Sequence, residues 1–325
     1  MPAGRRDIDH QPGAEDPAVL RHAGRHAARP AGAALARPPA PEPVFPAARN
    51  RLIRADCLDV LRALPSCAFD LIYIDPPFFT GRSHSGRDGL PQPGSFADPR
   101  AGGLAGYLSW LGPRLAEMHR VLKRSGSLMV HLDWHAVHYV KCELDGIFGY
   151  GNFVNEIIWQ YKTGGTSKRR LGRKHDTILF YAKSPCYKFN PVEEKSYLKH
   201  RYGFANVRIE RDEGGYYTRV GLRDVWDLPA LRGNQPETTG YPTQKPRALL
   251  DRIVALVTDP GDVVADFFCG SGTTLLAAQA AGRTWLGCDI SEAAVALCAR
   301  RLGDAAGPAG MPGTGRGFTV ERWGG

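Results

Sequence analysis

The amino-acid sequence predicts an α/β fold, a doubly wound and mostly parallel Rossmann-like sheet into which a second region is inserted. Short apolar strands alternate with amphipathic helices near both ends of the chain, and this alternation fades between residues 162 and 240. A length of 325 residues allows one large α/β domain with a substantial insertion. A hydrophobic content of 43% supports a packed core, and 23% charged residues support a soluble surface.

Two runs of strands and helices make up the predicted sheet. The segment 69–74 is almost continuously apolar, which is typical of a strand covered on both faces. The first run has strands at 51–55, 69–74, 127–132, 155–161 and 177–181, with helices over 58–64, over 104–122 and up to about 148. The second run has a helix at 247–257, a strand at 263–268, a helix at 273–281, a strand at 284–289 and a helix at 292–301. With right-handed crossovers, both runs form one sheet.

Composition divides the chain into five segments. Residues 1–48 are mostly Ala, Pro, Gly, Arg and His, which bury too little apolar surface to order, so a disordered tail is expected. Residues 304–325 form a similar C-terminal tail, in which the run 317–323 can dock on the fold. Between the tails we expect a first half of the main domain at 49–161, an inserted region at 162–240 and a second half at 241–303. The first part of the insertion, to about residue 183, can still pair with the sheet.

Positive charge is concentrated in the inserted region. The formal net charge is +9, and residues 160–235 hold 16 Lys and Arg against 8 Asp and Glu, with aromatic residues interleaved. Such a segment favours a polyanionic partner, although a charge run can also be an ordinary solvated face. Five residues there suit sequence-independent contacts with phosphates: Lys168, Arg169, Arg170, Arg173 and Lys174.

The cysteine and histidine patterns do not indicate a metal site. The seven cysteines include no Cys-x-x-Cys pair, which is typical of reduced structural cysteines in a cytosolic protein. His131, His135 and His138 lack a Cys or Glu that would complete a zinc-ligand spacing, so no metal is expected. No apolar run approaches the ~18 residues of a membrane span. The N-terminal segment also lacks the apolar stretch of a secretory signal, so a cytoplasmic protein is expected.

A strand, a glycine-rich turn and a helix follow one another in the second half of the chain. Gly270 and Gly272 allow a tight turn and a close approach of a ligand to backbone amides at the helix start. Asp289 ends the next strand, where a carboxylate can accept ribose hydroxyls. No Lys follows Gly272, which excludes a P-loop, and Leu275 replaces the third glycine of a dinucleotide loop. The remaining alternatives are an S-adenosylmethionine site, whose amino group Asp266 fits, and a purely structural glycine turn.

The tetrapeptide Asp75-Pro76-Pro77-Phe78 directly follows a buried strand, and open α/β sheets bind ligands at the carboxyl ends of such strands. Two prolines fix the backbone and remove two N–H donors, so the turn is rigid and presents hydrogen-bond acceptors. The Asp75 carboxylate and the Pro76 carbonyl can hold both hydrogens of an aromatic amine. Phe78 can stack on the base that carries this amine, a contact of roughly 1–3 kcal/mol. The alternative is an ordinary strand-ending turn with Phe78 in the core.

Taken together, these motifs resemble amino-group DNA methyltransferases of the beta order, in which the catalytic tetrapeptide precedes the recognition region and the cofactor loop follows it. The resemblance extends from about residue 51 to residue 302. It rests on segments that occur in the order of this family: 55–61, 70–78, 127–134, 175–183, 241–246, 266–274 and 287–291. It implies a methyltransferase sheet that uses S-adenosyl-L-methionine as cofactor and duplex DNA as partner.

The resemblance also implies roles for individual residues. Residues 75–78 would bind and orient a base flipped out of the duplex. Thr243 and Lys245 would close over the amino-acid end of the cofactor, and Asp56 would face the cofactor or the target base. The full set of implied cofactor-binding residues is Asp56, Thr243, Lys245, Asp266, Phe267, Phe268, Gly270, Gly272, Thr273 and Asp289. Many members of the family carry Tyr in place of Phe78, and stacking survives that change.

Two exocyclic amines pose the same chemical problem, N6 of adenine and N4 of cytosine. In the resembled family, Asp at the first position of the tetrapeptide is commoner in adenine enzymes, so Asp75 favours adenine. The alternatives are N4-cytosine methylation, methylation of a protein amide, and a catalytically inactive DNA-recognition subunit. We expect a nucleoid-associated cytoplasmic enzyme of restriction-modification type, for which a second copy of the chain and a cognate restriction endonuclease are partners to test.

Overall fold

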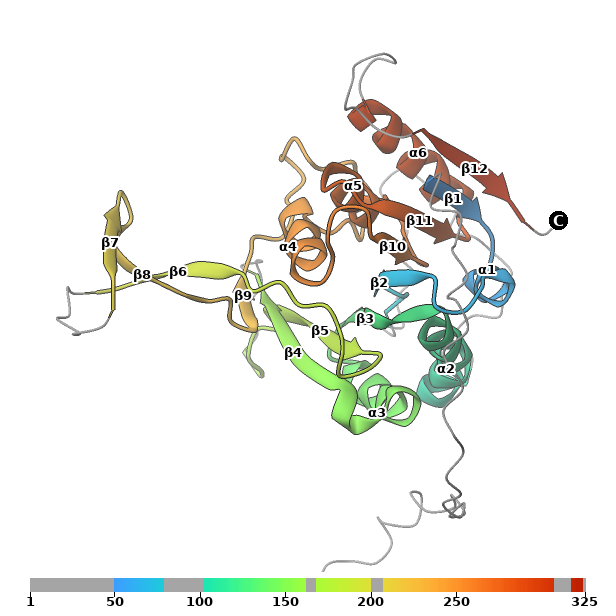
Figure 1. Ribbon diagram of the computed structural model, residues 1–325, viewed down its shortest axis with the longest axis horizontal. Coiled ribbons are helices and arrows are strands. Elements are labelled where there is room, and N and C mark those ends of the chain that lie inside the picture. The colour runs from blue at the N-terminus through green and yellow to red at the C-terminus, as the bar shows by residue number, and fades with distance from the viewer. Residues whose placement is uncertain (1–49, 79–101, 162–167, 200–206, 307–316, 324–325) are drawn as a thin grey trace, which may run out of the picture. The chain divides into compact units, whose positions relative to one another are not determined.

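The computed structural model describes residues 50–78, 102–161, 168–199, 207–306 and 317–323 (Figure 1). The tail predicted for residues 1–48 lies outside the described residues. The helices are α1 (Cys57–Ala63), α2 (Gly103–Val121), α3 (Val137–Phe148), α4 (Arg247–Val257), α5 (Thr273–Ala280) and α6 (Glu292–Ala306), with a 3-10 turn η1 (Tyr150–Asn152). The strands are β1 (Asn50–Arg54), β2 (Phe69–Ile74), β3 (Leu122–Leu132), β4 (Phe153–Gln160), β5 (His175–Ala182), β6 (Glu193–Tyr197), β7 (Ile209–Asp212), β8 (Gly215–Gly221), β9 (Val225–Asp227), β10 (Val263–Asp266), β11 (Thr284–Asp289) and β12 (Phe318–Arg322).

Nine of these strands form one sheet in the order β12-β1-β11-β10-β2-β3-β5-β4-β9. The strands from β12 to β3 are all parallel, and β5 runs antiparallel between β3 and β4. The two runs predicted from the sequence meet at the pairing of β10 with β2. The predicted doubly wound, mostly parallel sheet is therefore confirmed.

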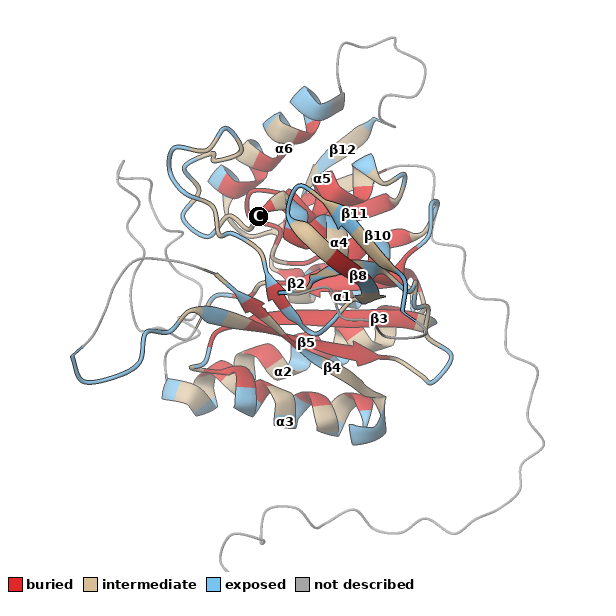
Figure 2. Cartoon of the chain, turned by 90° about the vertical axis from the view of Figure 1, so that its left-hand side faces the viewer, coloured by how far each residue is buried: buried red, intermediate tan, exposed pale blue. Residues whose placement is uncertain are grey.

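Helices cover the sheet on both faces (Figure 2). One apolar core lies between the sheet and α1, α2 and α3, and it includes Ile72 and Ile74 of β2. The second core lies between the sheet and α4, α5 and α6, and it includes Leu71 and Tyr73 of the same strand. Because alternate residues of β2 fill opposite cores, the strand has no polar face, as its apolar sequence predicted.

The inserted region is divided between the main sheet and a second, smaller sheet. β5 lies inside the main sheet, and β9 returns to pair with β4 at its edge. Between them, β6, β7 and β8 form a three-stranded antiparallel sheet. The sequence did not predict these three strands, because their charged residues obscure the apolar alternation that identifies strands.

The C-terminal run 317–323 docks on the fold as β12, which pairs with β1 at the edge of the sheet. The Arg51 guanidinium donates two hydrogen bonds of 2.7 Å to the Glu321 carboxylate across this pair. Earlier in the chain, β3 begins at Leu122, five residues before the predicted start of this strand at residue 127. Within the described residues, no helix is both long and apolar enough to cross a membrane.

One glycine of β11 allows α5 to approach the sheet closely. A Cβ atom at Gly287 would clash with Leu275 of α5, whose side chain is fully buried. We expect Gly287→Ala to lower the free energy of unfolding by about 1–3 kcal/mol, because Leu275 has no space into which it can move. Chemical denaturation measures this change. Gly303→Ala in α6 is the matched control, since no atom lies within 4 Å of its added Cβ. Equal stability of the two variants would contradict the close packing.

Candidate active site

Five neighbouring parallel strands each lead into an aspartate at the same edge of the sheet. Asp56 follows β1, Asp289 ends β11 and Asp266 ends β10, while Asp75 follows β2 and Asp133 follows β3. Because the carboxyl ends of parallel strands lie at one edge, motifs from both halves of the chain meet there. We call this edge the aspartate rim. It is the place where open α/β sheets bind their ligands.

The tetrapeptide turn contacts the segment that precedes α4. The Lys245 ammonium forms an ion pair with the Asp75 carboxylate, and both side chains are largely buried. The same ammonium lies 5.1 Å from the centre of the Phe78 ring. The sequence analysis placed Asp75 and Phe78 in the catalytic turn and Lys245 at the cofactor, and the structure brings all three together.

Asp266 is a buried carboxyl at the centre of the rim. It accepts hydrogen bonds from the Thr274 hydroxyl at 2.6 Å and from the Phe268 backbone N–H at 3.0 Å. Burial first, and the negative charges of Asp75 and Asp289 second, raise the pKa of Asp266 to about 7 against the lowering effect of these two hydrogen bonds. Asp266 therefore changes its protonation state close to neutral pH.

Asp289 ties the glycine loop to the end of β11. Its carboxylate accepts the backbone N–H of Gly270 and the backbone N–H of Ser291, each at 2.8 Å. Burial raises the pKa of the Asp289 carboxyl, although these backbone hydrogen bonds lower it. The predicted neighbourhood of Gly270 and Asp289 is therefore present in the structure.

Both glycines of the loop have backbone angles in the left-handed region, with φ +48° at Gly270 and φ +81° at Gly272. A Cβ at Gly270 would lie 3.1 Å from the ring of Tyr241, which packs over the loop. At Gly272 an added Cβ would clash with the Cys298 sulfur of α6. Gly272 is thus required for helix packing as well as for the turn, a constraint that the sequence analysis did not identify.

Three predicted cofactor residues have structural contacts instead of open side chains. The Phe267 ring is 1% exposed and packs edge to face on Phe69 at 5.9 Å, so its side chain is a core residue and not a cofactor ligand. Thr273 is buried and accepts a hydrogen bond of 3.2 Å from Arg301. Asp56 caps α1 and pairs with Arg114 through hydrogen bonds of 2.9 and 2.7 Å.

Other predicted cofactor residues keep accessible positions at the rim. Phe268 is half-buried and its ring lies 5.8 Å from that of Trp110. Thr243 is exposed in the segment before Lys245. Their contacts with a cofactor stay predictions.

A chain of buried polar side chains lies beside the catalytic turn. The Tyr73 hydroxyl is 2.8 Å from His131 Nδ1, and His131 Nε2 is 3.2 Å from Asp176. Tyr161 donates a hydrogen bond of 3.0 Å to the same carboxylate. The His131 ring lies 6.0 Å from the ring of Phe78, so the chain supports the turn from within the sheet. The sequence analysis considered His131 only as a metal ligand.

The described residues contain no group of three or more His, Cys, Asp or Glu side chains arranged to hold a metal ion. His131 is bound to Asp176, and His135 lies 2.5 Å from Asp133. These contacts account for two of the histidines singled out in the sequence.

The predicted DNA-contacting residues lie between β4 and β5, above the rim. Lys168, Arg169 and Arg170 are exposed, and the Arg173 guanidinium stacks 3.5 Å above the ring of Trp134. By contrast, two cations of the small sheet and one directly after it pair with acids, in the contacts Lys195–Asp212, Arg219–Glu210 and Arg223–Glu194. The sequence of the segment 168–174 contains five cations and no acid, whereas the small sheet contains charges of both signs.

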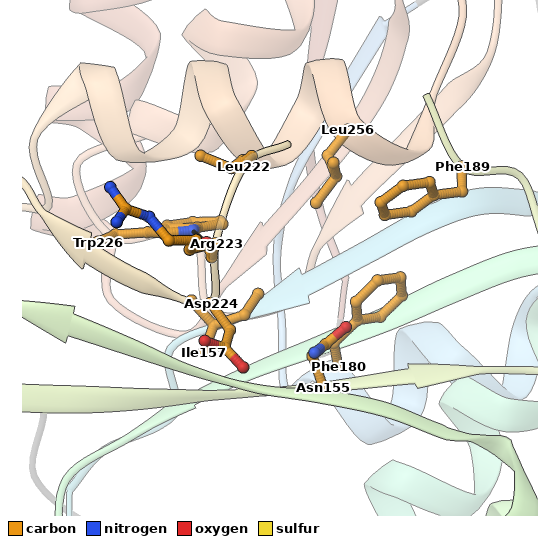
Figure 3. A pocket seen from close by; sticks show the side chains of 9 residues that line it. All are labelled: Asn155, Ile157, Phe180, Phe189, Leu222, Arg223, Asp224, Trp226 and Leu256. Carbon is orange, nitrogen blue, oxygen red and sulfur yellow. Dashed lines mark hydrogen bonds between the residues drawn. The ribbon is translucent and has the colours of Figure 1, made fainter. Parts of the chain in front are cut away.

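A shallow hollow lies elsewhere on the molecule, between the main sheet and α4 (Figure 3). Phe180 and Asn155 line it from the sheet, and Leu256 lines it from the C-terminal end of α4. Phe180 pairs with Met129 in the interior of β3, well before the rim. The hollow is therefore separate from the aspartate rim.

Two solved structures share this fold. The PvuII DNA methyltransferase (cytosine-N4-specific) has a TM-score of 0.54 at 18% identity, over 80% of this chain and 90% of that chain. A putative DNA modification methylase from Thermus thermophilus, complexed with S-adenosyl-L-methionine, has a TM-score of 0.53 at 20% identity, over 84% and 97% of the two chains. At these identities the likeness establishes the fold alone.

Sequence relatives have a higher identity to this chain than the two solved structures. DNA adenine methyltransferase YhdJ of Escherichia coli (strain K12) is 31% identical over 258 residues, which cover 77% of this chain and 82% of that protein. Type II methyltransferase M.BglII of Bacillus subtilis is 29% identical over 259 residues, which cover 75% and 66%. The sequence pattern of the DNA methylase family matches residues 69–300, a span that contains the catalytic turn and the glycine loop. The chain therefore belongs to the N6/N4 family of DNA methylases.

Proposed function

We propose that this DNA methyltransferase transfers the methyl group of S-adenosyl-L-methionine to the N6 amine of an adenine flipped out of duplex DNA. The main support for this proposal is that the tetrapeptide turn and the glycine loop lie at the neighbouring ends of β2 and β10. A methyl transfer needs its donor and acceptor side by side, and positioning supplies much of its rate.

The residues at the rim fit the proposed cofactor. S-adenosylmethionine has two positively charged groups, a sulfonium and an ammonium, and one negatively charged carboxylate. Its net charge is positive, so it suits a site where several acidic side chains lie close together. Asp75, Asp266 and Asp289 are close enough for the two outer charges to raise the pKa of Asp266. In this proposal Asp266 holds the ammonium, Asp289 holds the ribose and Gly270 lets the ligand approach the backbone. The bound cofactor supplies an already activated methyl group.

The turn holds the acceptor amine. An amine conjugated to a base ring is a weak nucleophile because its lone pair is delocalised into the ring. The Asp75 carboxylate and the Pro76 carbonyl accept hydrogen bonds from the two N–H groups of this amine. These hydrogen bonds direct the lone pair toward the methyl group and stabilise the positive charge that develops on nitrogen. Phe78 stacks on the base and fixes its plane. The Lys245 ammonium places a positive charge beside the Asp75 carboxylate and the Phe78 ring.

Two observations favour adenine over cytosine. The E. coli relative at 31% identity is named a DNA adenine methyltransferase, and the tetrapeptide of this chain begins with Asp75. The cytosine-N4-specific neighbour shares only the fold, at 18% identity. A catalytically inactive subunit is disfavoured, because both the turn and the glycine loop retain their chemical groups.

Further partners belong to the same proposal. M.BglII is named a Type II methyltransferase, and this name supports a restriction endonuclease as a cognate partner in the cell. Cleavage resistance of DNA from an expressing host tests that partner. A homodimer and an association with the nucleoid stay predictions.

Asp75→Ala tests the catalytic turn. We expect kcat to fall by about 10²–10³-fold, the usual effect of removing a preorganised electrostatic group. At pH 8, where Asp266 is ionised with or without the charge of Asp75, cofactor affinity should change little, since in this proposal Asp75 contacts the base. Single-turnover methylation assays and calorimetry measure the two quantities, and Asp59→Ala, an exposed acid of α1, is the control. Wild-type turnover in Asp75→Ala would remove the assigned role.

The methylated nucleoside tests the target base. Mass spectrometry of DNA from a host without its own adenine methylation should show N6-methyladenine when the wild-type chain is expressed, and much less of it when Asp75→Ala is expressed. N4-methylcytosine in its place would assign the enzyme to the other base of this family.

The raised pKa of Asp266 predicts how cofactor binding depends on pH. Only the ionised carboxylate attracts the ammonium, so affinity for S-adenosylhomocysteine should rise about tenfold between pH 6 and pH 8. In Asp266→Asn, calorimetry should show weaker binding that does not vary over this range. A flat profile in the wild type would place the ammonium elsewhere.

The same carboxyl predicts a pH-dependent stability. An acid whose pKa is higher in the folded state than in the unfolded state favours folding at low pH. The free energy of unfolding therefore falls as the pH rises from about 4 to about 7. The fall is at most about 4 kcal/mol if the pKa of Asp266 is about 3.9 in the unfolded state and about 7 in the folded state. Ligand-free Asp266→Asn should therefore gain stability over the wild type at pH 8 but not at pH 4. Equal differences at both pH values would contradict the raised pKa.

A further inference from the structure

Flipping an adenine leaves a gap in the base stack of the duplex, and the cost of that gap opposes methylation. Proteins that unstack DNA often insert an apolar side chain such as Leu, Ile, Met or Phe between the bases. Neither the tetrapeptide turn nor the glycine loop supplies such a group, because in the proposed function both contact the flipped base or the cofactor at the aspartate rim.

Leu171 stands out among the exposed apolar side chains. Its exposed fraction is 91%, higher than that of any other large hydrophobic residue in the described part of the chain. Its sequence neighbours within three positions are a glycine and five cations, Lys168, Arg169, Arg170, Arg173 and Lys174. An apolar group surrounded by cations matches the pattern of duplex DNA, in which apolar base faces lie between two rows of phosphates.

Two contacts anchor the chain directly after Leu171. The Arg173 guanidinium stacks on Trp134, whose ring lies 3.7 Å from that of His135. The Tyr161 backbone N–H donates to the carbonyl of Lys174 at 2.9 Å, which closes the base of the loop. Leu171 thus projects from an anchored segment.

The anchored segment rises from the same edge as the catalytic turn. It leads into β5, which is separated from β2 by β3 alone. Val130 of β3 pairs with Ile74 of β2 and with Leu179 of β5, so β5 begins four residues beyond the level at which β2 ends. With about 4.8 Å between strands and about 3.4 Å per residue, the start of β5 lies ~17 Å from the end of β2. Trp134 follows Asp133 of the aspartate rim, so its contact with Arg173 ties this residue to the rim.

We propose that Leu171 is the wedge that enters the duplex and fills the gap left by the flipped base, while the flanking cations hold the phosphates. This inference rests on the proposed function, since it requires a base outside the stack. Trp134 acts as a positioning residue, because its contact with Arg173 sets the place of the wedge.

Two DNA substrates separate a wedge from an ordinary contact. In one the target adenine is paired, and in the other it faces an abasic position, so that little pairing is lost when the adenine leaves the stack. We expect Leu171→Ala to lower kcat/KM by about tenfold on the paired substrate, the size of one lost contact with a base. On the second substrate the deficit should shrink to less than about threefold, and Leu171→Met should retain activity on both.

Val320→Ala is the matched control, since this residue is also an exposed apolar side chain but lies on β12 at the far edge of the sheet. It should leave kcat/KM unchanged on both substrates. Trp134→Ala should show the same substrate-dependent deficit as Leu171→Ala, and Trp134→Phe should restore part of the loss. An equal deficit of Leu171→Ala on both substrates, or no deficit, would overturn the wedge.

The methylation product keeps this test separate from the proposed function. If the wild-type chain yields N6-methyladenine and Leu171→Ala behaves like the wild type, only the wedge fails. If the wild-type chain methylates neither substrate, the proposed function fails, and the wedge fails with it.

Discussion

The parallel pairing of β2 with β10 is the constraint on which the rest of the site depends. These strands come from distant parts of the chain, and their register, with Val264 opposite Leu71, places Asp75 and Asp266 at one edge. The inserted region enters and leaves through β4, β5 and β9 on one side of this junction. Changes in the insertion can therefore alter the proposed DNA contacts while the junction between turn and cofactor loop stays the same.

Acidic side chains that lie at one edge of the sheet repel one another, and the fold offsets the negative charges of four of them in different ways. Asp75 pairs with Lys245, Asp56 pairs with Arg114, and Asp289 accepts backbone N–H groups. For Asp266, burial outweighs the two hydrogen bonds that it accepts, and its pKa rises. A cationic ligand would relieve this repulsion, so the same charges that weaken the ligand-free protein favour binding. Function and stability are opposed at this residue, as is common at binding sites.

The sequence was sufficient for the fold class and for the two motifs, because buried strands and glycine turns leave local patterns. It could not identify contacts that depend on tertiary packing. The clash that requires a glycine at position 272 comes from Cys298 on another helix, and the core position of Phe267 depends on Phe69. Nothing near His131 in the sequence indicates its bond to Asp176. The strands of the small sheet were missed because their polar residues hide the alternation.

The turn and the cofactor loop form one joint site only if Asp75 and Asp266 share one electrostatic environment, and the pH midpoint of cofactor binding in Asp75→Asn tests this most directly. Neutralising Asp75 removes a negative charge that raises the pKa of Asp266, and it frees Lys245 to act on the same site. Calorimetric titrations with S-adenosylhomocysteine should therefore show a midpoint below the wild-type value of about 7. An unchanged midpoint would show that the turn and the cofactor loop are electrostatically independent, which contradicts a single joint site.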